Sequence, residues 1–571
     1  MSRSDSHQPI DVRRRAIAAC FPNAWQPETF DRYFARAVTR YGDRPLVITD
    51  EATWSYEEIA ARADAIARGL RRHGVGAGDH VALVMANHPA FVPLLLGAWR
   101  LGAAVIPVSY LFKAEELTYV IEQSGARVVV TMDAFRDLDY LAMLDRAAPG
   151  WRQGRVERFP ELSAVVVHGA APAGVPDVDT LEASGRADAT PPPPTPVRPD
   201  DPAVVMYTSG TTGLPKGVIQ THDNLLRMAY ATAYHRAFED GRRILFALPL
   251  YHAFGLVEGL LAATIVGGAI VPQLVFDAGA TLDAIARHRV TEALLVPTMS
   301  LALVEHPRAG LVDTSSLHSV LAGSAPTPVH VWQTLKAKLG VAELFTGYGM
   351  TELTSATTET APDDGLDRLA STVGRPKAAG IAGLADRGGE IAEYRTVDPF
   401  TGTFLADGEE GELVARGPTT TRGYFGKPTE TAALLLDGGW IRSGDLGRVR
   451  TDGYIELTGR SKELYKSGGE LVAPKEVEEA LHAHAAVSQS YVIGLPDDRW
   501  GEIGCAWVVT TASASASEEE LITFCRARLA KFKVPRHVLL TEAAALPLSA
   551  TGKVQKFRLI EMARVRLGRA Q

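Results

Sequence analysis

The stretch that decides the fold is YTSGTTGLPKG, residues Tyr207 to Gly217, which directly follows an apolar run at 203–206. A strand that ends in such a loop suits phosphate, because glycines let backbone N–H groups approach closely and a lysine supplies positive charge. It is not a Walker A loop, since Gly210 is not followed at the required spacing by Gly-Lys-Ser/Thr. The phosphate contacts that we expect from it are Thr208, Ser209, Gly210, Thr211, Thr212, Gly213 and Lys216.

Strands and helices alternate on both sides of this loop. A capping box at Ser55 and Glu58 opens a helix whose apolar face runs to Leu70. Apolar runs of strand length lie at 80–85, 104–108, 127–131 and 164–167, and then at 203–207, 244–248, 293–296 and 319–322. Such alternation is typical of parallel sheets built from βα units, so the predicted fold class is α/β.

A proline-rich segment, PPPPTPVRPDDP, interrupts the alternation and predicts a linker near residues 190–200, because it cannot join a sheet ladder. We expect one α/β subdomain before it. A second is expected after it, with the strand at 203–207 as its first strand and a helix at about 328–339.

The pattern changes again toward the C-terminus. Glycines at 402, 408, 411 and 417 punctuate short β-patterned runs and predict a small antiparallel unit over about 372–457. Pro474 then marks a helix start, and β-branched runs follow at 487–493 and 506–510. We therefore expect a large N-terminal domain, residues 1–459, of α/β subdomains plus a small β unit, and a small C-terminal α/β domain, residues 460–571.

The composition disfavours several classes of protein. The 571 residues carry a net charge of −8, which argues against a nucleic-acid surface, because such surfaces cluster Lys and Arg. The cysteines, Cys20, Cys505 and Cys525, have no paired spacing, which disfavours a disulfide framework and a zinc site. No apolar stretch reaches about 18 residues, so we expect no integral membrane segment and a cytoplasmic location.

Six motifs in chain order resemble those of the adenylate-forming superfamily, which includes AMP-binding acyl- and aryl-CoA ligases, luciferases and adenylation domains of nonribosomal peptide synthetases. They are the loop at Tyr207, PLYHAFG at Pro249, GYGMTE at Gly347, SGD at Ser443, GRSKELYKSGGE at Gly459 and LSATGKVQK at Leu548. The resemblance implies a carboxylic acid:CoA ligase that forms an acyl-adenylate from ATP with release of pyrophosphate, and then an acyl-CoA thioester. It also implies that the C-terminal domain is mobile and rotates between the two half-reactions.

ATP, Mg²⁺ and coenzyme A are the cofactors that this resemblance implies. In GYGMTE, Tyr348, flanked by Gly347 and Gly349, looks like the residue that stacks on adenine, and Thr351 looks like a phosphate contact. Glu352 looks like the carboxylate that holds the metal. The chemistry is consistent, because Mg²⁺ is typically held by one or two carboxylates together with phosphate oxygens of the substrate.

Charged residues near the C-terminus take further roles in the resemblance. Asp445 resembles the aspartate that binds the ribose hydroxyls, and Arg460 resembles a second ribose or phosphate contact. Lys462 falls at the hinge position, and Lys466 lies in the post-hinge segment that contacts the cofactor. Lys553 resembles the lysine that reaches the substrate carboxylate and the α-phosphate, where a positioned cation stabilises the charge of the transition state. Gly501 and Glu502 resemble the loop that faces coenzyme A.

The motif PLYHAFG indicates which class of acid the protein binds. His252 matches the histidine at the mouth of the acyl pocket, with a gating or substrate-contacting role. Amino-acid-activating members carry an aspartate near this motif and aryl-siderophore members carry an asparagine just after the histidine, whereas this chain has Ala253 and Phe254. A non-amino acid, fatty or aromatic, is therefore expected. The predicted pocket residues are Tyr251, His252, Phe254, Gly323, Ser324 and Ala325.

Several alternatives stay open in the sequence. No carrier domain follows the last motif, which favours coenzyme A as acceptor, but an acyl-AMP ligase that loads a separate carrier protein is an alternative. A catalytically idle nucleotide- or acyl-binding protein and an oxidative, luciferase-like enzyme are others, as is a homodimer for the assembly. The segment IAGLADRGGE, residues 381–390, looks like an insertion that could reshape a surface or a partner site. Cys505, in an apolar run, is expected to be a buried thiol and not an acyl carrier.

Overall fold

The computed structural model describes residues 8–21, 24–153, 156–188, 190, 197–208, 215–460, 463–467, 470–497, 499–511, 515–548 and 554–568. The chain forms two compact units. The first comprises Met1–Glu393 and Arg416–Ile441, and the second comprises Tyr394–Ala415 and Arg442–Gln571. Most of the proline-rich linker, residues 191–196, lies outside the described residues.

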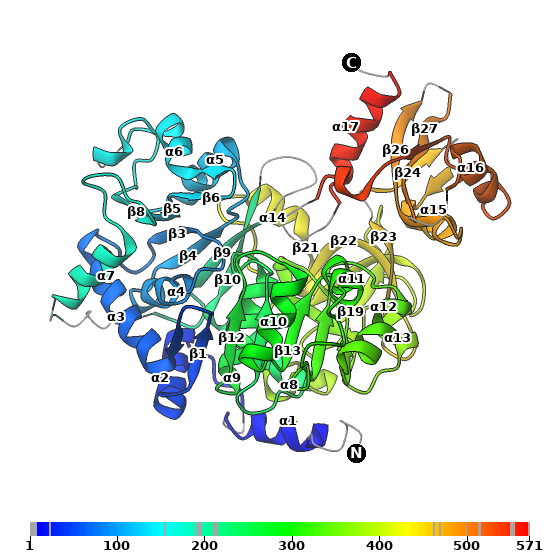
Figure 1. Cartoon of the computed structure of the whole chain (residues 1–571). Helices are drawn as coiled ribbons and strands as arrows, with labels where there is room; N and C mark the ends of the chain where they lie inside the picture. Colours follow the sequence, from blue (N-terminus) through cyan, green and yellow to red (C-terminus); the bar gives the residue numbers. More distant parts are fainter. Residues whose placement is uncertain are drawn as a thin grey trace. The chain divides into compact units, whose positions relative to one another are not determined.

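The first unit is built around two large sheets flanked by helices (Figure 1). One has six strands in the order β10-β9-β4-β3-β5-β8, parallel except for β10. Its strands are β3 (His80–Val84), β4 (Ala104–Val108), β5 (Val128–Met132), β8 (Ala164–His168), β9 (Pro202–Thr208) and β10 (Lys216–Thr221). Helix α3 (Tyr56–Arg72) precedes these strands in sequence, and the helices between them are α4 (Phe91–Arg100), α5 (Ala114–Ser124), α6 (Tyr140–Ala147) and α7 (Val178–Arg186).

The other large sheet has seven strands in the order β15-β14-β13-β11-β12-β1-β2, with β2 antiparallel at the edge. Its strands are β1 (Pro45–Ile48), β2 (Thr53–Ser55), β11 (Arg243–Phe246), β12 (Ala269–Pro272), β13 (Glu292–Leu295), β14 (Ser319–Ala322) and β15 (Glu343–Phe345). The helices near it in sequence are α2 (Phe30–Tyr41), α8 (His222–His235), the π-helix η3 (Phe254–Leu261), α9 (Ala262–Ile265), α10 (Ala278–His288), α11 (Pro297–Glu305) and α12 (Val329–Thr334). The expected α/β class and the alternation of strands and helices are confirmed.

The assignment of strands to subdomains needs one correction. We expected the strand at 203–207 to open the second subdomain, but β9 pairs parallel with β4 and so completes the first sheet, with Val204 opposite Val105. Conversely, β1 lies beside β12 in the second sheet, with Val47 opposite Ile270. The apolar pattern of a buried strand identifies it as a strand but carries no information about its neighbour, so the exchange could not be read from periodicity.

Local signals in the sequence were more informative. Ser55 and Glu58 form the predicted capping box of α3, each side chain accepting from the other residue's backbone N–H. The predicted helix at 328–339 is α12, which continues as a π-helical turn, η4 (Leu335–Leu339). The segment 381–390 contains 3₁₀ turns and lies against α8, where Arg227 donates to the Ala382 carbonyl at 2.7 Å.

The second unit contains most residues of an antiparallel sheet, β19 (Glu393–Val397), β20 (Gly411–Arg416), β22 (Trp440–Val449) and β23 (Ile455–Arg460), as expected for the small β unit. A separate sheet follows, with strands β24 (Tyr465–Ser467), β25 (Glu470–Val472), β26 (Val487–Asp497), β27 (Gly501–Thr510) and β28 (His537–Leu540). Its helices are α15 (Pro474–His482), α16 (Glu518–Arg526) and α17 (Lys556–Arg566). Pro474 is the first residue of α15, as predicted, because a missing N–H costs nothing there.

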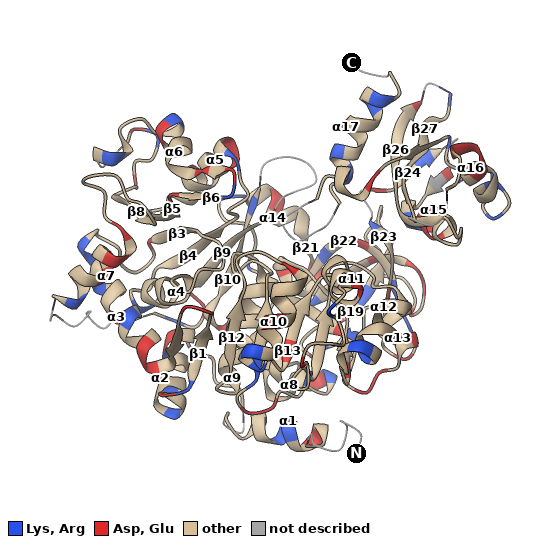
Figure 2. Cartoon of the chain, viewed as in Figure 1, with Lys and Arg blue, Asp and Glu red and all other residues tan. Residues whose placement is uncertain are grey.

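The distribution of charged residues, the length of the apolar helices and the burial of Cys505 relate to the expectations drawn from composition. Lys and Arg are interspersed with Asp and Glu over the helices of the first unit (Figure 2). No helix among the described residues is both long and apolar enough to span a membrane. Cys505 is fully buried, as expected for a thiol of the core.

Candidate active site

The phosphate loop is carried by a β-hairpin. Strands β9 and β10 are antiparallel, so that Thr208 and Lys216 lie opposite each other at the two ends of the loop. The loop itself, which contains the predicted contacts Ser209 to Gly213, lies outside the described residues. Close to the loop, the Tyr207 hydroxyl donates to Gln123 Oε1, and this hydrogen bond holds the end of β9.

The predicted adenine and metal residues lie on a second hairpin. Strand β16 (Gly347–Gly349) pairs with β17 (Ala356–Glu359), with Tyr348 opposite Thr358. A Cβ on Gly349 would lie 2.1 Å from the Ser355 carbonyl oxygen, so only glycine fits that position. Thr351 and Glu352 stand in the 3₁₀ turn between the strands, η5 (Thr351–Leu353).

This turn is held by residues that the sequence analysis did not single out. Gln220, which is fully buried on β10, donates to the carbonyls of Thr351 at 3.1 Å and Thr354 at 3.2 Å. The Thr421 N–H donates to the Glu352 carbonyl at 2.8 Å. Thr354 has a left-handed backbone, with φ of 79°, and these hydrogen bonds offset the strain of that conformation.

One further side chain contacts both halves of the predicted ATP site. Tyr424 donates its hydroxyl to Glu352 Oε1 at 2.7 Å, and its ring centroid lies 5.0 Å from Lys216 Nζ. Burial and the charge of Glu352 raise the pKa of Tyr424, so the phenol stays protonated and acts as a donor. The structure thus brings Lys216 and Glu352 to one place, as the resemblance implies, through a tyrosine in the segment TRGYF at 421–425.

The acyl-pocket motif leads into the π-helix η3. His252 Nδ1 accepts from the Phe254 N–H at 3.2 Å, which places the imidazole at the start of this helix. The preceding backbone is fixed by Asn87, which donates to the Leu248 carbonyl at 2.9 Å and accepts from the Leu250 N–H at 2.8 Å. Asn87 is buried, and the sequence analysis missed it because it lies more than 160 residues before the motif.

Phe254 and the strand-end segment after β14 lie close together. A Cβ on Gly323 would lie 3.3 Å from the Phe254 ring, which places the ring beside this glycine. Ser324 follows with a positive φ of 79°, and Ala325 is exposed. Tyr251 is buried, and its ring packs edge-to-face on Tyr110 with centroids 5.3 Å apart.

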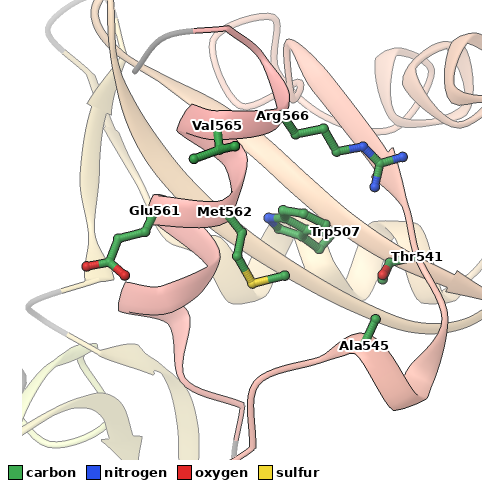
Figure 3. A pocket seen from close by; sticks show the side chains of 7 residues that line it. All are labelled: Trp507, Thr541, Ala545, Glu561, Met562, Val565 and Arg566. Carbon is green, nitrogen blue, oxygen red and sulfur yellow. The ribbon is translucent and has the colours of Figure 1, made fainter. Parts of the chain in front are cut away.

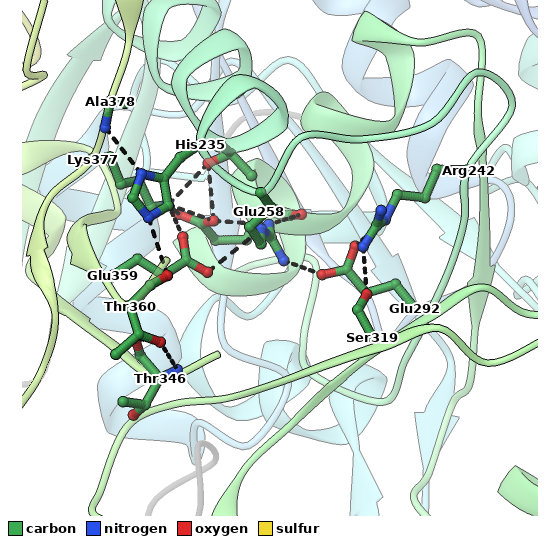
Figure 4. Close-up of polar contacts among 12 residues, drawn as sticks. His235, Arg242, Glu258, Glu292, Ser319, Thr346, Glu359, Thr360, Lys377 and Ala378 are labelled. Carbon is green, nitrogen blue, oxygen red and sulfur yellow. Dashed lines mark hydrogen bonds and ion pairs between the residues drawn. The ribbon is translucent and has the colours of Figure 1, made fainter. Parts of the chain in front are cut away.

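A fully buried group of charged side chains includes Glu258, on the π-helix that follows the acyl motif (Figure 4). Lys377 Nζ lies 2.8 Å from Glu258 Oε2 and 3.2 Å from Glu359 Oε2. Glu258 belongs to η3, so this group ties the π-helix to β17 and to β18 (Arg375–Pro376). Although burial alone would raise the pKa of Glu258, the charges of Lys377 and Arg236 lower it. The fully buried members are Arg236, Arg242, Glu258, Glu292, Glu359 and Lys377.

In the second unit, the predicted ribose residues face each other across β22 and β23. Arg460 Nε lies 2.9 Å from Asp445 Oδ1. The turn that presents Asp445 is fixed by Ser443, whose Oγ accepts from the Asp445 N–H at 3.0 Å and donates to the Leu413 carbonyl at 2.6 Å. Asp445 is buried, whereas the Arg460 side chain is 46% exposed.

Of the post-hinge segment in the second unit, Lys466 and Ser467 belong to the described residues. The Lys466 N–H donates to Glu502 Oε2 at 2.8 Å, which joins two segments assigned to coenzyme A. Lys556 Nζ lies 2.6 Å from Glu463 Oε2 and 2.8 Å from Glu478 Oε1, contacts that the sequence analysis missed. The predicted hinge residue Lys462 and the predicted catalytic residue Lys553 lie outside the described residues.

A cavity of about 430 Å³ lies beside α17 in the second unit (Figure 3). None of the predicted site residues is among those that line it. Its lining residues are Trp507, Thr541, Ala545, Glu561, Met562, Val565 and Arg566.

The residues present fit a magnesium ion bound together with ATP. Among the described residues there is no cluster of three His, Cys, Asp or Glu side chains that could hold a metal by themselves. A single carboxylate, Glu352, stands near the lysine of the phosphate loop. This agrees with the usual coordination of Mg²⁺, which is bound by one or two carboxylates together with phosphate oxygens and water.

Comparisons with known proteins agree with this arrangement. The AMP-binding enzyme family model matches residues 34–425, and the model of the AMP-binding enzyme C-terminal domain matches residues 476–553. A putative acyl-CoA synthetase, YngI, of Bacillus subtilis (strain 168) is 32% identical, over 93% of this chain and 96% of the relative. A feruloyl-CoA synthase of Amycolatopsis sp is 35% identical, over 88% and 92%. The crystal structure of ATP-bound MatB from Rhodopseudomonas palustris is 29% identical with a TM-score of 0.79, over 94% of this chain and 99% of that one.

The fold and the site therefore define an adenylate-forming enzyme, and the chain belongs to the AMP-binding enzyme family. Within that superfamily its relatives are CoA ligases and synthetases, so the protein is an AMP-forming acid–thiol ligase of the acyl- and aryl-CoA ligase family.

Proposed function

We propose that the protein activates a fatty or aryl carboxylic acid with ATP and transfers the acyl group to coenzyme A. The observation that carries this substrate class is the contact between Phe254 and Gly323. Where amino-acid-activating and aryl-siderophore relatives place polar residues, this chain has Ala253 and Phe254, and the Phe254 ring lies beside the strand-end Gly323. Similarity to a feruloyl-CoA synthase supports an acid with an apolar or aromatic body.

In the first half-reaction, the substrate carboxylate attacks the α-phosphorus of ATP, an acyl-adenylate forms and pyrophosphate leaves. Lys216 and the phosphate loop bind the phosphates, Tyr348 stacks on adenine, and Asp445 with Arg460 binds the ribose. Mg²⁺, when bound at Glu352, neutralises charge on the phosphate oxygens. Lys553 stabilises negative charge at the α-phosphate, where a positioned cation lowers the barrier.

In the second half-reaction, the thiol of coenzyme A attacks the acyl carbonyl and AMP leaves. No nucleophilic side chain is required in either step. His252 lies at the start of η3, and we assign it a gating role between the substrate and the route by which the thiol would arrive. The C-terminal domain, with its boundary near residue 459 and its hinge at Lys462, rotates between the steps. A cytoplasmic location belongs to the same proposal.

The test is pyrophosphate release from ATP and Mg²⁺ across a panel of short, medium and long fatty acids and benzoate- and cinnamate-type acids, with and without coenzyme A. Release with one class of acid, together with an acyl-CoA product, would support the proposal. Release that coenzyme A does not accelerate would favour a carrier protein as acceptor. No release with any acid of the panel would overturn the assignment to fatty and aryl acids.

A further inference from the structure

The side chain of Tyr424 lies between the two charged residues that the proposed function assigns to ATP. Its hydroxyl donates to Glu352 Oε1 at 2.7 Å, and its ring centroid lies 5.0 Å from Lys216 Nζ, within the range of a cation–π contact. No other hydrogen bond or ion pair to the Glu352 carboxylate is recorded among the described residues, so Oε2 has no protein partner there.

The backbone around Tyr424 is tied to the same two hairpins. The Phe425 N–H donates to the Gly217 carbonyl at 2.7 Å, and the Ile219 N–H donates to the Gly423 carbonyl at 3.1 Å. Val218 and Tyr424 thus form a bridge next to β10. The Tyr424 N–H donates to Thr431 Oγ1 at 2.9 Å, on α14 (Pro428–Leu434). Strand pairing therefore fixes the backbone that carries the phenol, and the hydrogen bond to Glu352 holds the side chain itself.

We propose that Tyr424 is a positioning residue of the metal–ATP site, whose hydroxyl orients the Glu352 carboxylate for Mg²⁺ and whose ring holds Lys216 beside it. The inference rests on the proposed function, because it takes Glu352 and Lys216 as the metal and phosphate residues.

A phenol suits this task better than a cation does. An ammonium or guanidinium group on Glu352 would compete with Mg²⁺ for the carboxylate charge, whereas a neutral hydroxyl fixes one oxygen and leaves the full charge for the metal. The hydroxyl uses Oε1, and Oε2 is left to the ion. The ring attracts Lys216 only weakly, so the lysine can leave it for the more strongly attracting phosphates.

The substitution that isolates this role is Tyr424→Phe, which keeps the ring and removes only the hydroxyl. Tyr33→Phe is a matched control, because the Tyr33 hydroxyl also makes a buried hydrogen bond, 2.9 Å to the Thr264 carbonyl, away from the site. Calorimetric titration with ATP, in Mg²⁺ and in EDTA without acid or coenzyme A, gives the factor by which the metal tightens binding. Thermal unfolding of both variants checks that they are folded.

For Tyr424→Phe we expect this factor to fall roughly threefold to tenfold, the usual scale for losing a single hydrogen bond, with binding in EDTA unchanged. Tyr33→Phe should keep the factor of the unsubstituted protein. The positioning role would be overturned if Tyr424→Phe kept the factor of the unsubstituted protein. It would also be overturned if the variant lost the same amount of ATP affinity in Mg²⁺ and in EDTA. In either case the proposed function would still stand. If the unsubstituted protein binds ATP no better with Mg²⁺, the metal site of the proposed function fails, and this inference fails with it.

Discussion

Arg460 faces Asp445 across the antiparallel strands β22 and β23, with Nε 2.9 Å from Asp445 Oδ1. The two residues are separated along the chain by a strand, a turn and the returning strand, and the register of the ladder alone sets them opposite each other. The Asp445 N–H donates to Ser443 Oγ, which fixes the backbone of this turn, and the ion pair with Arg460 holds the carboxylate. Under the proposed function, this carboxylate is the acceptor for the ribose hydroxyls.

Replacing Asp445 with asparagine should therefore weaken nucleotide binding. The amide side chain would remove the charged acceptor for the ribose hydroxyls and leave Arg460 without its ion pair, so we expect the KM for ATP to rise about tenfold. The KM for coenzyme A should stay unchanged. Glu410→Gln is the control, because it breaks an exposed pair, 2.8 Å to Arg448 on the same sheet. Equal KM values for ATP in the two variants would contradict the ribose role.

The acyl pocket can be narrowed at Gly323. An added Cβ would lie 3.3 Å from the Phe254 ring, so the ring must shift by a few tenths of an ångström and the space beside it shrinks. For Gly323→Ala we expect kcat/KM for cinnamate-type or long-chain acids to fall roughly tenfold relative to short acids, the usual scale for one methyl group in a pocket. The measurement is the ratio of kcat/KM values across the acid panel.

The second substitution Phe254→Leu, added to Gly323→Ala, should restore part of the activity toward bulky acids, because leucine does not fill the space of the ring. Gly76→Ala serves as control, since its nearest heavy atom, Asp79 Oδ2, is 3.8 Å from the added Cβ. A uniform loss for all acids in Gly323→Ala would argue against a pocket wall at this position.

The features that the sequence predicted correctly are those with a local signature. The capping box of α3, the proline that opens α15 and the apolar strands are each encoded within about ten neighbouring residues. The motifs behind the proposed site residues are also local, and the roles of those residues stay predictions. The structure brings Lys216 and Glu352 to one tyrosine, which the resemblance did not name.

The features that the sequence did not reveal depend on distant pairing. Nothing near Val204 states that its strand pairs with Val105, and nothing near Asn87 states that it fixes the backbone of Leu250. Tyr424 shares this property, because its role follows from a bridge to Val218 and not from its neighbours. The buried charges behind η3 were missed for a related reason: a charged residue in a sequence is expected at the surface unless its partners are known.

The buried charges give a test of stability at Lys377. The substitution Lys377→Met removes the cation nearest to both Glu258 and Glu359 and leaves buried carboxylates without full compensation. We expect the free energy of unfolding to fall by about 3–5 kcal/mol, the usual cost of removing one partner of a buried ion pair. Chemical denaturation of the whole chain measures it.

Arg308→Met is the matched control, because Arg308 pairs with Asp283 where both side chains are more than a third exposed. Exposed pairs contribute about 0–1 kcal/mol, so this variant should unfold almost as the unsubstituted protein does. If Lys377→Met were no less stable than Arg308→Met, the cluster would not contribute as its burial implies.

His235 gives the clearest dependence of stability on pH. The imidazole is buried on α8, where Nδ1 accepts from the Ala378 N–H at 3.0 Å and Nε2 donates to the Thr360 carbonyl at 3.1 Å. A proton on Nδ1 would face another N–H, so the ring must be neutral. Burial, together with the charge of Lys377, lowers the pKa of His235 to about 3.

The sign follows from the two states. In the unfolded chain, the imidazole of His235 takes up a proton as the pH falls below about 6.5. In the folded protein it stays neutral until about pH 3. The contribution of His235 therefore lowers the free energy of unfolding as the pH falls through this range, and it has no effect above about pH 7. His235→Gln offers an amide acceptor and donor without a titrating proton, so its stability should fall less steeply between about pH 7 and pH 4. His330→Gln, at an exposed position on α12, should keep the original slope. Denaturation curves at several pH values measure the slopes, and an unchanged slope in His235→Gln would show that another group governs the loss of stability in acid.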